Sequence, residues 1–377
     1  MLKKHEVLSF ASKTKSAGRI YKRNLHQDLC LTLTRRRETV RHLNDEDHFF
    51  FLNRRGFHTS KPSLTIAKKK AGSIIPSKSS PSLRGWLTLE GYRIYPWSIS
   101  GLETCVVINA EDDKKLAVTF DIGYTTRPSV RCQQVFISHG HMDHVSGLFQ
   151  HATKRSLYNL SPAVYYVPPN LVETLRNVGK QLHSLSGTPD ILLDLDIRPI
   201  QPGDSVLVTP EYEIRPFATF HRVPSQGYLL YHRYKRLKPL YRHLRPKEIA
   251  VMENQCREEN IYEVSWLPEV AFTGDTTFEL FLNNPPADLL KVRVLILEAT
   301  YLENVTPGIV RKARERGHTH LSEIIDHAHL FSDVERLVLI HLSDKYSSSF
   351  ARDAVSFQMP PSLLNKVVIA TLAKDRS

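Results

Sequence analysis

The sequence has little cysteine and no long apolar run, and each absence excludes a class of protein. Its four cysteines are widely spaced and form no Cys-x-x-Cys pair, which fits neither a disulfide framework nor a thiolate zinc site. No apolar run approaches the ~18 to 20 residues of a membrane span, so the sequence predicts no transmembrane segment. With 41% apolar and 24% charged residues, most of the 377-residue chain can bury a core. We therefore expect a folded protein in a reducing compartment.

Acidic residues are scarce only in the N-terminal part of the chain. Residues 1–80 contain 18 basic and 6 acidic side chains, whereas residues 81–377 contain 33 of each. The formal net charge of +12 therefore belongs to the first segment, and the body is not a generally basic nucleic-acid coat. Within that segment, the order Arg-x-Phe-x-x-Ser at residues 55–60 resembles the two-step cleavage site of mitochondrial presequences.

The composition divides the chain into three parts. We interpret residues 1–60 as an organelle-targeting presequence or a disordered basic leader, residues 61–84 as a linker, and residues 85–377 as one folded domain. The acidic residues at 45–47 are unusual in a transit peptide. The mitochondrial matrix is the predicted location, with the nucleus or cytoplasm and the chloroplast as alternatives.

Short apolar segments alternate with helical patterns through the body. Strands are predicted at 87–94, 104–108, 116–122, 134–137, 163–167, 214–217, 270–272, 292–297 and 337–340, and helices at 171–183 and 322–331. Several strands end in a loop that carries His or Asp. Strands that present functional groups at their C-terminal ends, with helices outside, indicate a layered α/β body.

The strongest motif follows the apolar segment 134–137. Four potential metal ligands fall within six residues: His139, His141, Asp143 and His144. His139 and His141 can point to one side while Asp143 and His144 face a second position, so two cations can share the loop. Imidazole and carboxylate suit zinc and neighbouring metals, and the lack of thiolates argues against a closed structural site. We therefore expect an open, catalytic metal site.

This motif resembles the His-x-His-x-Asp-His signature of the metallo-β-lactamase superfamily, which implies a four-layer αββα sandwich. Residues 120–123, 221–228, 272–277 and 341–346 look like the remaining motifs of that superfamily. The resemblance implies that Asp121 accepts a hydrogen bond from a ligand imidazole and that Asp275 bridges two metals. It also implies two zinc ions per chain, one held by His139, His141, His221 and Asp275, the other by Asp143, His144, His341 and Asp275.

In this order the motifs are similar to those of tRNase Z, the endonuclease family that removes the 3′ trailer from precursor tRNA, and especially to its short plant form. Two further elements match, at residues 297–300 and 317–320, although Leu297 replaces a family histidine. The resemblance implies that Glu298 orients His318, that His318 protonates the leaving 3′ oxygen, and that Asp143 accepts a proton from the attacking water. His320 remains the less certain neighbour, because it can equally cap the following helix.

RNA binding is indicated by a basic stretch at residues 231–247 that contains three tyrosines and no acidic residue. Its candidate RNA-binding residues are Arg233, Lys235, Arg236, Lys238 and Arg242. By analogy, residues 171–194 are placed as the arm that grips the tRNA, and a homodimer is expected from the resemblance. The alternatives are a superfamily hydrolase of a small phosphodiester or thioester, and an RNA-binding protein without activity.

Overall fold

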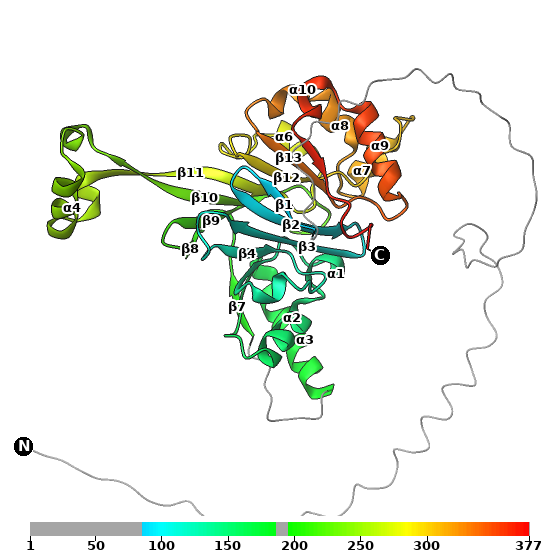
Figure 1. Cartoon of the computed structure of the whole chain (residues 1–377). Helices are drawn as coiled ribbons and strands as arrows, with labels where there is room; N and C mark the ends of the chain where they lie inside the picture. The colour runs from blue at the N-terminus through cyan, green and yellow to red at the C-terminus, as the bar shows by residue number, and fades with distance from the viewer. Residues whose placement is uncertain (1–84, 186–194, 377) are drawn as a thin grey trace, which may run out of the picture. The chain divides into compact units, whose positions relative to one another are not determined.

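The computed structural model describes residues 85–185 and 195–376. The predicted leader at 1–60, the linker at 61–84 and residues 186–194 lie outside the described residues. None of the helices in the described ranges has the length and apolar character needed to cross a bilayer. The described residues form two sheets with helices on their outer faces (Figure 1).

The first sheet has seven strands in the order of the sequence. Its strands are β1 (Leu87–Leu89), β2 (Tyr92–Ile99), β3 (Glu103–Ala110), β4 (Ala117–Phe120), β5 (Gln134–Phe136), β6 (Val164–Val167) and β7 (Asp196–Pro199). Strands β1 to β4 are antiparallel neighbours, whereas β4 to β7 run parallel. The loops that follow β4 and β5 therefore leave the sheet at the same edge.

The second sheet also has seven strands, in the order β14-β13-β12-β11-β10-β9-β8. They are β8 (Val206–Thr209), β9 (Tyr212–Ala218), β10 (Gln226–Leu237), β11 (Tyr262–Phe272), β12 (Val294–Glu298), β13 (Arg336–Ile340) and β14 (Val367–Ile369). Strands β11 to β14 are parallel, so their C-terminal ends also share one edge.

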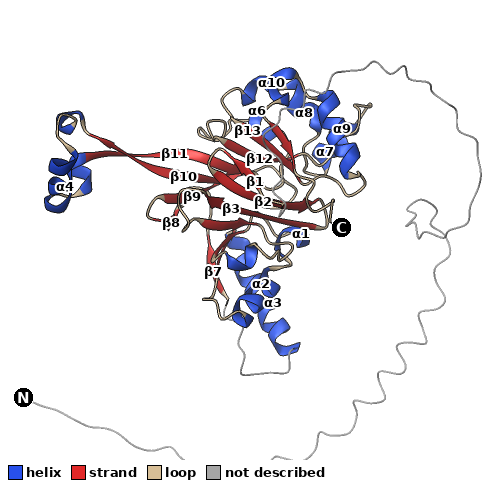
Figure 2. Ribbon diagram, viewed as in Figure 1, coloured by secondary structure: helices blue, strands red, loops and turns tan. Residues whose placement is uncertain are grey.

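Apolar side chains from both sheets form the central core, which includes Ile108, Phe120, Leu230, Val270 and Ile296. Helices cover the two outer faces (Figure 2). They are α1 (Met142–Val145), α2 (Leu148–Leu157), α3 (Val172–Leu185), α6 (Glu279–Leu282), α7 (Ile309–Glu315), α8 (Leu321–Asp326), α9 (Ser348–Gln358) and α10 (Pro361–Leu364), with the short 3₁₀ turns η1 (Ser129–Arg131), η2 (Pro169–Leu171) and η4 (Ala328–Phe331). The predicted αββα order of layers is confirmed.

Strands β10 and β11 continue beyond the rest of their sheet. Strand β9 pairs with β10 only as far as His232, whereas β10 and β11 stay paired out to Leu237 and Tyr262. The outer part is therefore a two-stranded ribbon, and Figure 1 shows it extending from the sheets with α4 at its tip. The tip contains η3 (Pro239–Tyr241), α4 (Pro246–Gln255) and α5 (Glu258–Ile261). We call residues 233–262 the arm.

Two expectations from the sequence need correction. The arm was expected at residues 171–194, but α3 occupies most of that segment and packs on the body through Leu175 and through Gly179, which faces Phe149 and Leu195. The helix expected at 322–331 ends at Asp326, because His327 leaves helical geometry before η4 begins.

Candidate active site

The motif residues leave the sheets at strand ends. Asp121 follows β4, His139 is the third residue after β5, Asp275 is the third residue after β11, and His341 follows β13. Asp121 and His341 adopt φ values of 54° and 58°, a left-handed conformation that non-glycine residues rarely take. Both are buried and hydrogen-bonded, so the surrounding structure holds this backbone strain at the site.

The first ligand group consists of His139, His141, His221 and Asp275, whose ligand atoms all lie within 4.8 Å of one another. His141 Nδ1 lies 2.9 Å from His139 Nε2 and 3.3 Å from His221 Nε2. The oxygen Oδ2 of Asp275 faces this group, 3.7 Å from His139 Nε2 and 4.0 Å from His221 Nε2. Three imidazoles and one carboxylate oxygen thus converge on one point.

The second group consists of Asp143, His144 and His341. The Nε2 atoms of His144 and His341 lie 3.2 Å apart, and Asp143 Oδ2 lies 3.3 Å from His341 Nε2. The other oxygen of Asp275, Oδ1, lies 3.4 Å from both imidazole nitrogens. Asp275 therefore presents one oxygen to each group, which is the arrangement expected of a bridging carboxylate.

The donor set fits a pair of zinc ions. Asp275 Oδ1 is buried and accepts no hydrogen bond within the described part of the chain. Burial lowers the pKa values of His139, His141 and His221, so these imidazoles are neutral at pH 7, as a metal ligand must be. Neutral nitrogen and carboxylate oxygen, without sulfur, are the ligands of many catalytic zinc sites.

Other side chains fix the orientation of the imidazoles. Asp121 is fully buried, and its Oδ2 lies 2.7 Å from His144 Nδ1, so the contact expected of Asp121 is present. Ser138 donates to the same carboxylate through its backbone N–H and its hydroxyl. His221 Nδ1 lies 2.7 Å from the carbonyl oxygen of Gly317. The contacts of His144 with Asp121 and of His221 with Gly317 each occupy one ring nitrogen and turn the other toward the ligand groups.

His318 and Glu298 form a dyad beside the ligand groups. His318 Nδ1 lies 3.1 and 3.2 Å from the two oxygens of Glu298, which is fully buried. Burial lowers the pKa of His318, but the negative charge and hydrogen bond of Glu298 outweigh that effect and raise this pKa to about 9. His318 is therefore a cation at neutral pH that still has Nε2 available as a donor.

Glu298 is held by more than His318. The backbone N–H of Thr276 donates to Oε1 at 2.6 Å, and the hydroxyl of Thr300 donates to Oε2 at 2.5 Å. The backbone N–H of Thr319 also donates to Oε2, at 3.3 Å. All three residues lie within the matched segments 272–277, 297–300 and 317–320, but the sequence did not reveal their role in holding Glu298.

Two departures from the family pattern have simple structural explanations. Leu297 and Glu298 are consecutive residues of β12, so their side chains point to opposite faces of the sheet. Leu297 faces the helices that cover the sheet, and it is fully buried among apolar side chains there. Replacing the family histidine by leucine therefore leaves the contacts of Glu298 intact. His320 is the N-cap of α8 and accepts a hydrogen bond from the backbone N–H of Ser322. It is a capping residue here.

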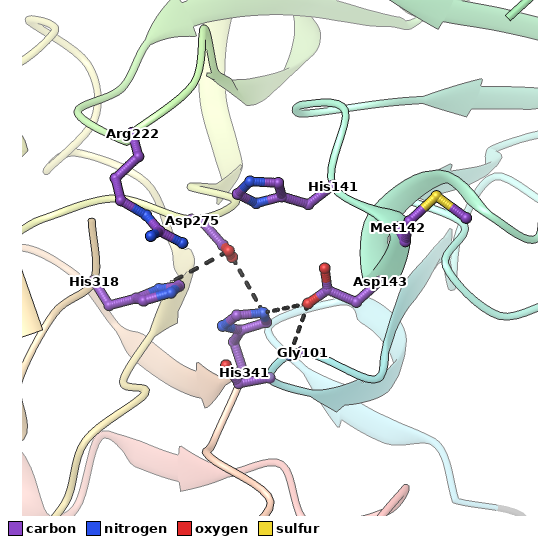
Figure 3. Close-up of a pocket in the computed structure, with 9 residues that line it drawn as sticks. Gly101, His141, Met142, Asp143, Arg222, Asp275, His318 and His341 are labelled. Carbon is purple, nitrogen blue, oxygen red and sulfur yellow. Dashed lines mark hydrogen bonds and ion pairs between the residues drawn. The ribbon is translucent and has the colours of Figure 1, made fainter. Parts of the chain in front are cut away.

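A pocket opens above the ligand groups (Figure 3). Gly101 and Met142 line one side, and Arg222 and His318 line the other. The backbone N–H of Gly101 donates to Asp143 Oδ2 at 2.8 Å. Gly101 and Arg222 were not identified from the sequence as pocket residues, although Arg222 directly follows His221.

The predicted RNA-binding residues lie outside this pocket, on the arm and its tip. Arg233 and Lys235 point toward Glu211 and Glu258, with Arg233 Nη2 and Lys235 Nζ lying 2.8 and 3.2 Å from Glu258 Oε1. The stretch that contains no acid in sequence thus meets acidic residues in space. Arg236 and Arg242 are exposed and form no ion pair within the described residues.

Comparison with known proteins places the chain among enzymes of one kind. It is 36% identical over 272 residues to the chloroplastic tRNase Z TRZ2 of Arabidopsis thaliana, a match that covers 72% of this chain and 73% of that relative. The identity to tRNase Z TRZ1 of the same plant is 36% over 288 residues, covering 76% of this chain and 97% of the relative. No family model matches the chain.

Among solved structures, the short form of human tRNase Z is 20% identical with a TM-score of 0.45, and the match covers 67% of this chain and 93% of that chain. The nuclear ribonuclease Z of Triticum aestivum is 36% identical over 166 residues, which is 43% of this chain and 88% of the relative. Given the sequence identity to TRZ1 and TRZ2 over most of its length, the chain belongs to the tRNase Z family.

Proposed function

We propose that this chain is a zinc-dependent endoribonuclease that removes the 3′ trailer from precursor tRNA and leaves a 3′ hydroxyl on the tRNA. The observation that carries the proposal is the position of Asp275, whose two oxygens face two separate groups of imidazole and carboxylate ligands. A shared carboxylate between two metals is a recurring feature of phosphodiester hydrolysis.

The two ligand groups hold two zinc ions per chain in this proposal. His139, His141 and His221 hold one ion, Asp143, His144 and His341 hold the other, and Asp275 binds both. When bound, the metal pair lowers the pKa of water and offsets negative charge on the phosphoryl oxygens. Asp143, a member of the second group, also lines the pocket, and in this proposal its carboxylate accepts a proton from the attacking water.

His318 supplies the proton for the leaving group. The leaving 3′ oxygen of the last tRNA nucleotide is strongly basic, so cleavage needs a positioned acid. His318 lines the pocket, and Glu298 keeps it protonated and fixes its ring through Nδ1. Its Nε2 then donates to the 3′ oxygen, which leaves a hydroxyl on the tRNA and a 5′ phosphate on the trailer.

The arm binds RNA in this proposal, through basic residues at its outer end. Arg236 and Arg242 are exposed and Lys238 is half-buried; they lie on the outer end of β10 and beside η3, where we expect the phosphates of an elongated substrate to bind. Arg233 and Lys235 contribute less, because Glu211 and Glu258 already compensate their charge. A small-molecule hydrolase has no need of this surface, which favours a tRNA substrate.

The test is to incubate the full chain with a 3′-extended precursor tRNA and map both ends at the cut. We expect one endonucleolytic cut after the last tRNA nucleotide, a 3′ hydroxyl on the tRNA, and loss of activity with a zinc chelator. Rapid hydrolysis of a small thioester or phosphodiester by protein that leaves the precursor intact would favour the alternative hydrolase.

We propose further that the chain is a homodimer. Val178, Leu182 and Leu185 follow one another at helical spacing along α3, and they are 40%, 41% and 80% exposed. Such an apolar stripe is typical of an interaction surface. Light scattering of the purified full chain tests this, and a mass of one chain of 43.2 kDa at micromolar concentration contradicts it.

For residues 1–60 we propose targeting to the mitochondrial matrix, on the basis of the Arg-x-Phe-x-x-Ser order at 55–60. A chloroplastic relative makes the chloroplast the main alternative. Import of the radiolabelled full chain into isolated mitochondria and chloroplasts distinguishes the two organelles, and import into neither would favour the nucleus or cytoplasm.

A further inference from the structure

Arg222 is a charged residue of the pocket that the mechanism above does not use. It directly follows His221 in the loop between β9 and β10, and its side chain is exposed. Figure 3 shows its guanidinium directed into the pocket, toward Asp275 and His318. Within residues 85–185 and 195–376, this guanidinium makes no ion pair and no hydrogen bond, unlike Arg293 and Arg336, which pair with Glu90.

The backbone that carries Arg222 is fixed on several sides. His221 is held through Nδ1 by the carbonyl of Gly317, and the carbonyl of Phe220 accepts a hydrogen bond from the N–H of Thr277. Gly317 has φ 79°, and a Cβ there would lie 3.1 Å from the backbone nitrogen of Arg222 and 2.4 Å from the His221 ring. The loops therefore pack closely, and the base of the Arg222 side chain has a defined position.

The chemistry of the cut determines which part of the RNA reaches Arg222. Displacement at phosphorus proceeds in line, so the attacking water and the leaving 3′ oxygen lie on opposite sides of the phosphorus. His318 protonates that oxygen, and the last tRNA nucleotide therefore lies on the His318 side of the pocket. The strand continues from this nucleotide, through its own 5′ phosphate, toward the body of the tRNA.

We propose that Arg222 binds the phosphate on the 5′ side of the last tRNA nucleotide, one nucleotide upstream of the bond that is cut. This inference rests on the proposed tRNA 3′ endonuclease function. The guanidinium has five N–H donors in a planar fork that matches two phosphate oxygens, and none of these donors has a partner within the described residues. Arg222 is thus a positioning residue for the RNA strand.

The position of the arm agrees with this assignment. Strand β10 begins at Gln226, four residues after Arg222, and continues outward into the arm. The loop with Arg222 therefore connects the leaving-group side of the pocket to the surface proposed to bind the tRNA. Gly101 and Met142 lie on the opposite side of the pocket.

The experiment compares wild type, two variants of Arg222 and one control variant on three substrates. Full-chain wild type, Arg222→Gln and Arg222→Lys are tested on precursor tRNA, on the same precursor with a neutral methylphosphonate at the proposed phosphate, and on bis(p-nitrophenyl) phosphate. The control variant is Arg311→Gln, which removes an exposed arginine of α7 that pairs with Glu315 outside the pocket. Zinc content is measured for every variant.

We expect Arg222→Gln to lower kcat/KM for precursor tRNA by about 10- to 100-fold, the usual worth of a hydrogen-bonded charge pair. Activity on bis(p-nitrophenyl) phosphate, which has no neighbouring phosphate, should change by less than about twofold. Arg222→Lys should recover only part of the loss, because it lacks the planar fork. The methylphosphonate should slow wild type but have little further effect on Arg222→Gln.

Three results contradict the proposal. An equal loss of activity on precursor tRNA and on the small substrate would place Arg222 on the phosphate that is cut. Unchanged kcat/KM of Arg222→Gln for precursor tRNA would mean that Arg222 does not contact the RNA. Additive effects of the variant and the methylphosphonate would mean that Arg222 binds elsewhere on the RNA. If wild type fails to cut precursor tRNA, the endonuclease function itself is wrong and the Arg222 assignment falls with it.

Discussion

In the pocket, Asp275 is 2% exposed and lies within 4.0 Å of five imidazoles, whereas on the arm Arg236 is exposed and has no ion pair within the described residues. Both regions concentrate charge, but the surroundings differ. Burial makes each interaction in the pocket strong and each unmatched charge costly, while water and salt weaken the interactions of the arm.

This difference predicts two kinds of response to mutation. A change at the ligand groups or the dyad alters a specific step, because Asp275, Asp143 and His318 each have fixed partners there. A change on the arm alters substrate affinity gradually, because several exposed cations act on the same polyanion. The four predictions below run from the largest expected effect to the smallest.

Asp275→Ala should lower activity on every substrate by at least about 10³-fold, because each ligand group loses the carboxylate oxygen that Asp275 presents to it. Competition with a chelator should show weaker binding of both zinc ions. Asp353→Ala, which removes an exposed aspartate from α9, is the matched control and should retain activity. Loss of only one zinc in Asp275→Ala would show that Asp275 belongs to a single ligand group.

His318→Ala should keep its zinc and its RNA affinity but turn over about 10²- to 10⁴-fold more slowly if His318 is the general acid. The measurement is single-turnover cleavage at saturating protein. Bis(p-nitrophenyl) phosphate has a leaving group of low pKa that needs no proton, so its hydrolysis should largely survive. Loss of zinc would instead make His318 a ligand, and an equal loss on both substrates would place the proton donor elsewhere.

The pH dependence of cleavage tests the dyad. His318 donates only when protonated, so activity should be present below its pKa of about 9 and should fall as the pH rises through that value. Glu298→Gln removes the negative charge that raises this pKa, so the basic limb of the profile should move to lower pH. The position of the limb is the readout, and an unchanged limb would contradict a proton held by Glu298.

Neutralising the arm should have the smallest effect per residue. Arg236→Gln with Arg242→Gln should raise KM for precursor tRNA several-fold and reduce the salt dependence of log KM by roughly 0.7 to 0.9 per lost phosphate contact. Arg233→Gln is the comparison on the same strand, and its effect should be smaller because Arg233 already pairs with Glu258. A larger effect of Arg233→Gln would mean that RNA displaces Glu258.

The sequence predicted the pocket much better than the arm. His139, His141, Asp143 and His144 are separated by short intervals at a strand end, so local geometry alone brings them together. His221, Asp275 and His341 come from distant positions, and the resemblance to known motifs identified them. Asp275 and His341 reach the site because β11 and β13 belong to the parallel part of the sheet, whose strands end at one edge.

The arm was harder to predict because its properties depend on partners that are distant in sequence. Residues 231–247 contain no acid, yet folding brings Glu211 and Glu258 to Arg233 and Lys235. The extension itself follows from the length of β10 and β11 beyond β9, which no local pattern reveals. Arg222 was missed because an exposed arginine in a loop has no distinctive sequence signal.

The most direct test of the account is to titrate metal-free full chain with zinc while following bound zinc and precursor tRNA cleavage in the same samples. The account predicts that cleavage reaches its maximum at two zinc ions per chain, since Asp275 joins two ligand groups in one centre. Full activity at one zinc ion per chain, with the second ion binding without effect, would contradict it.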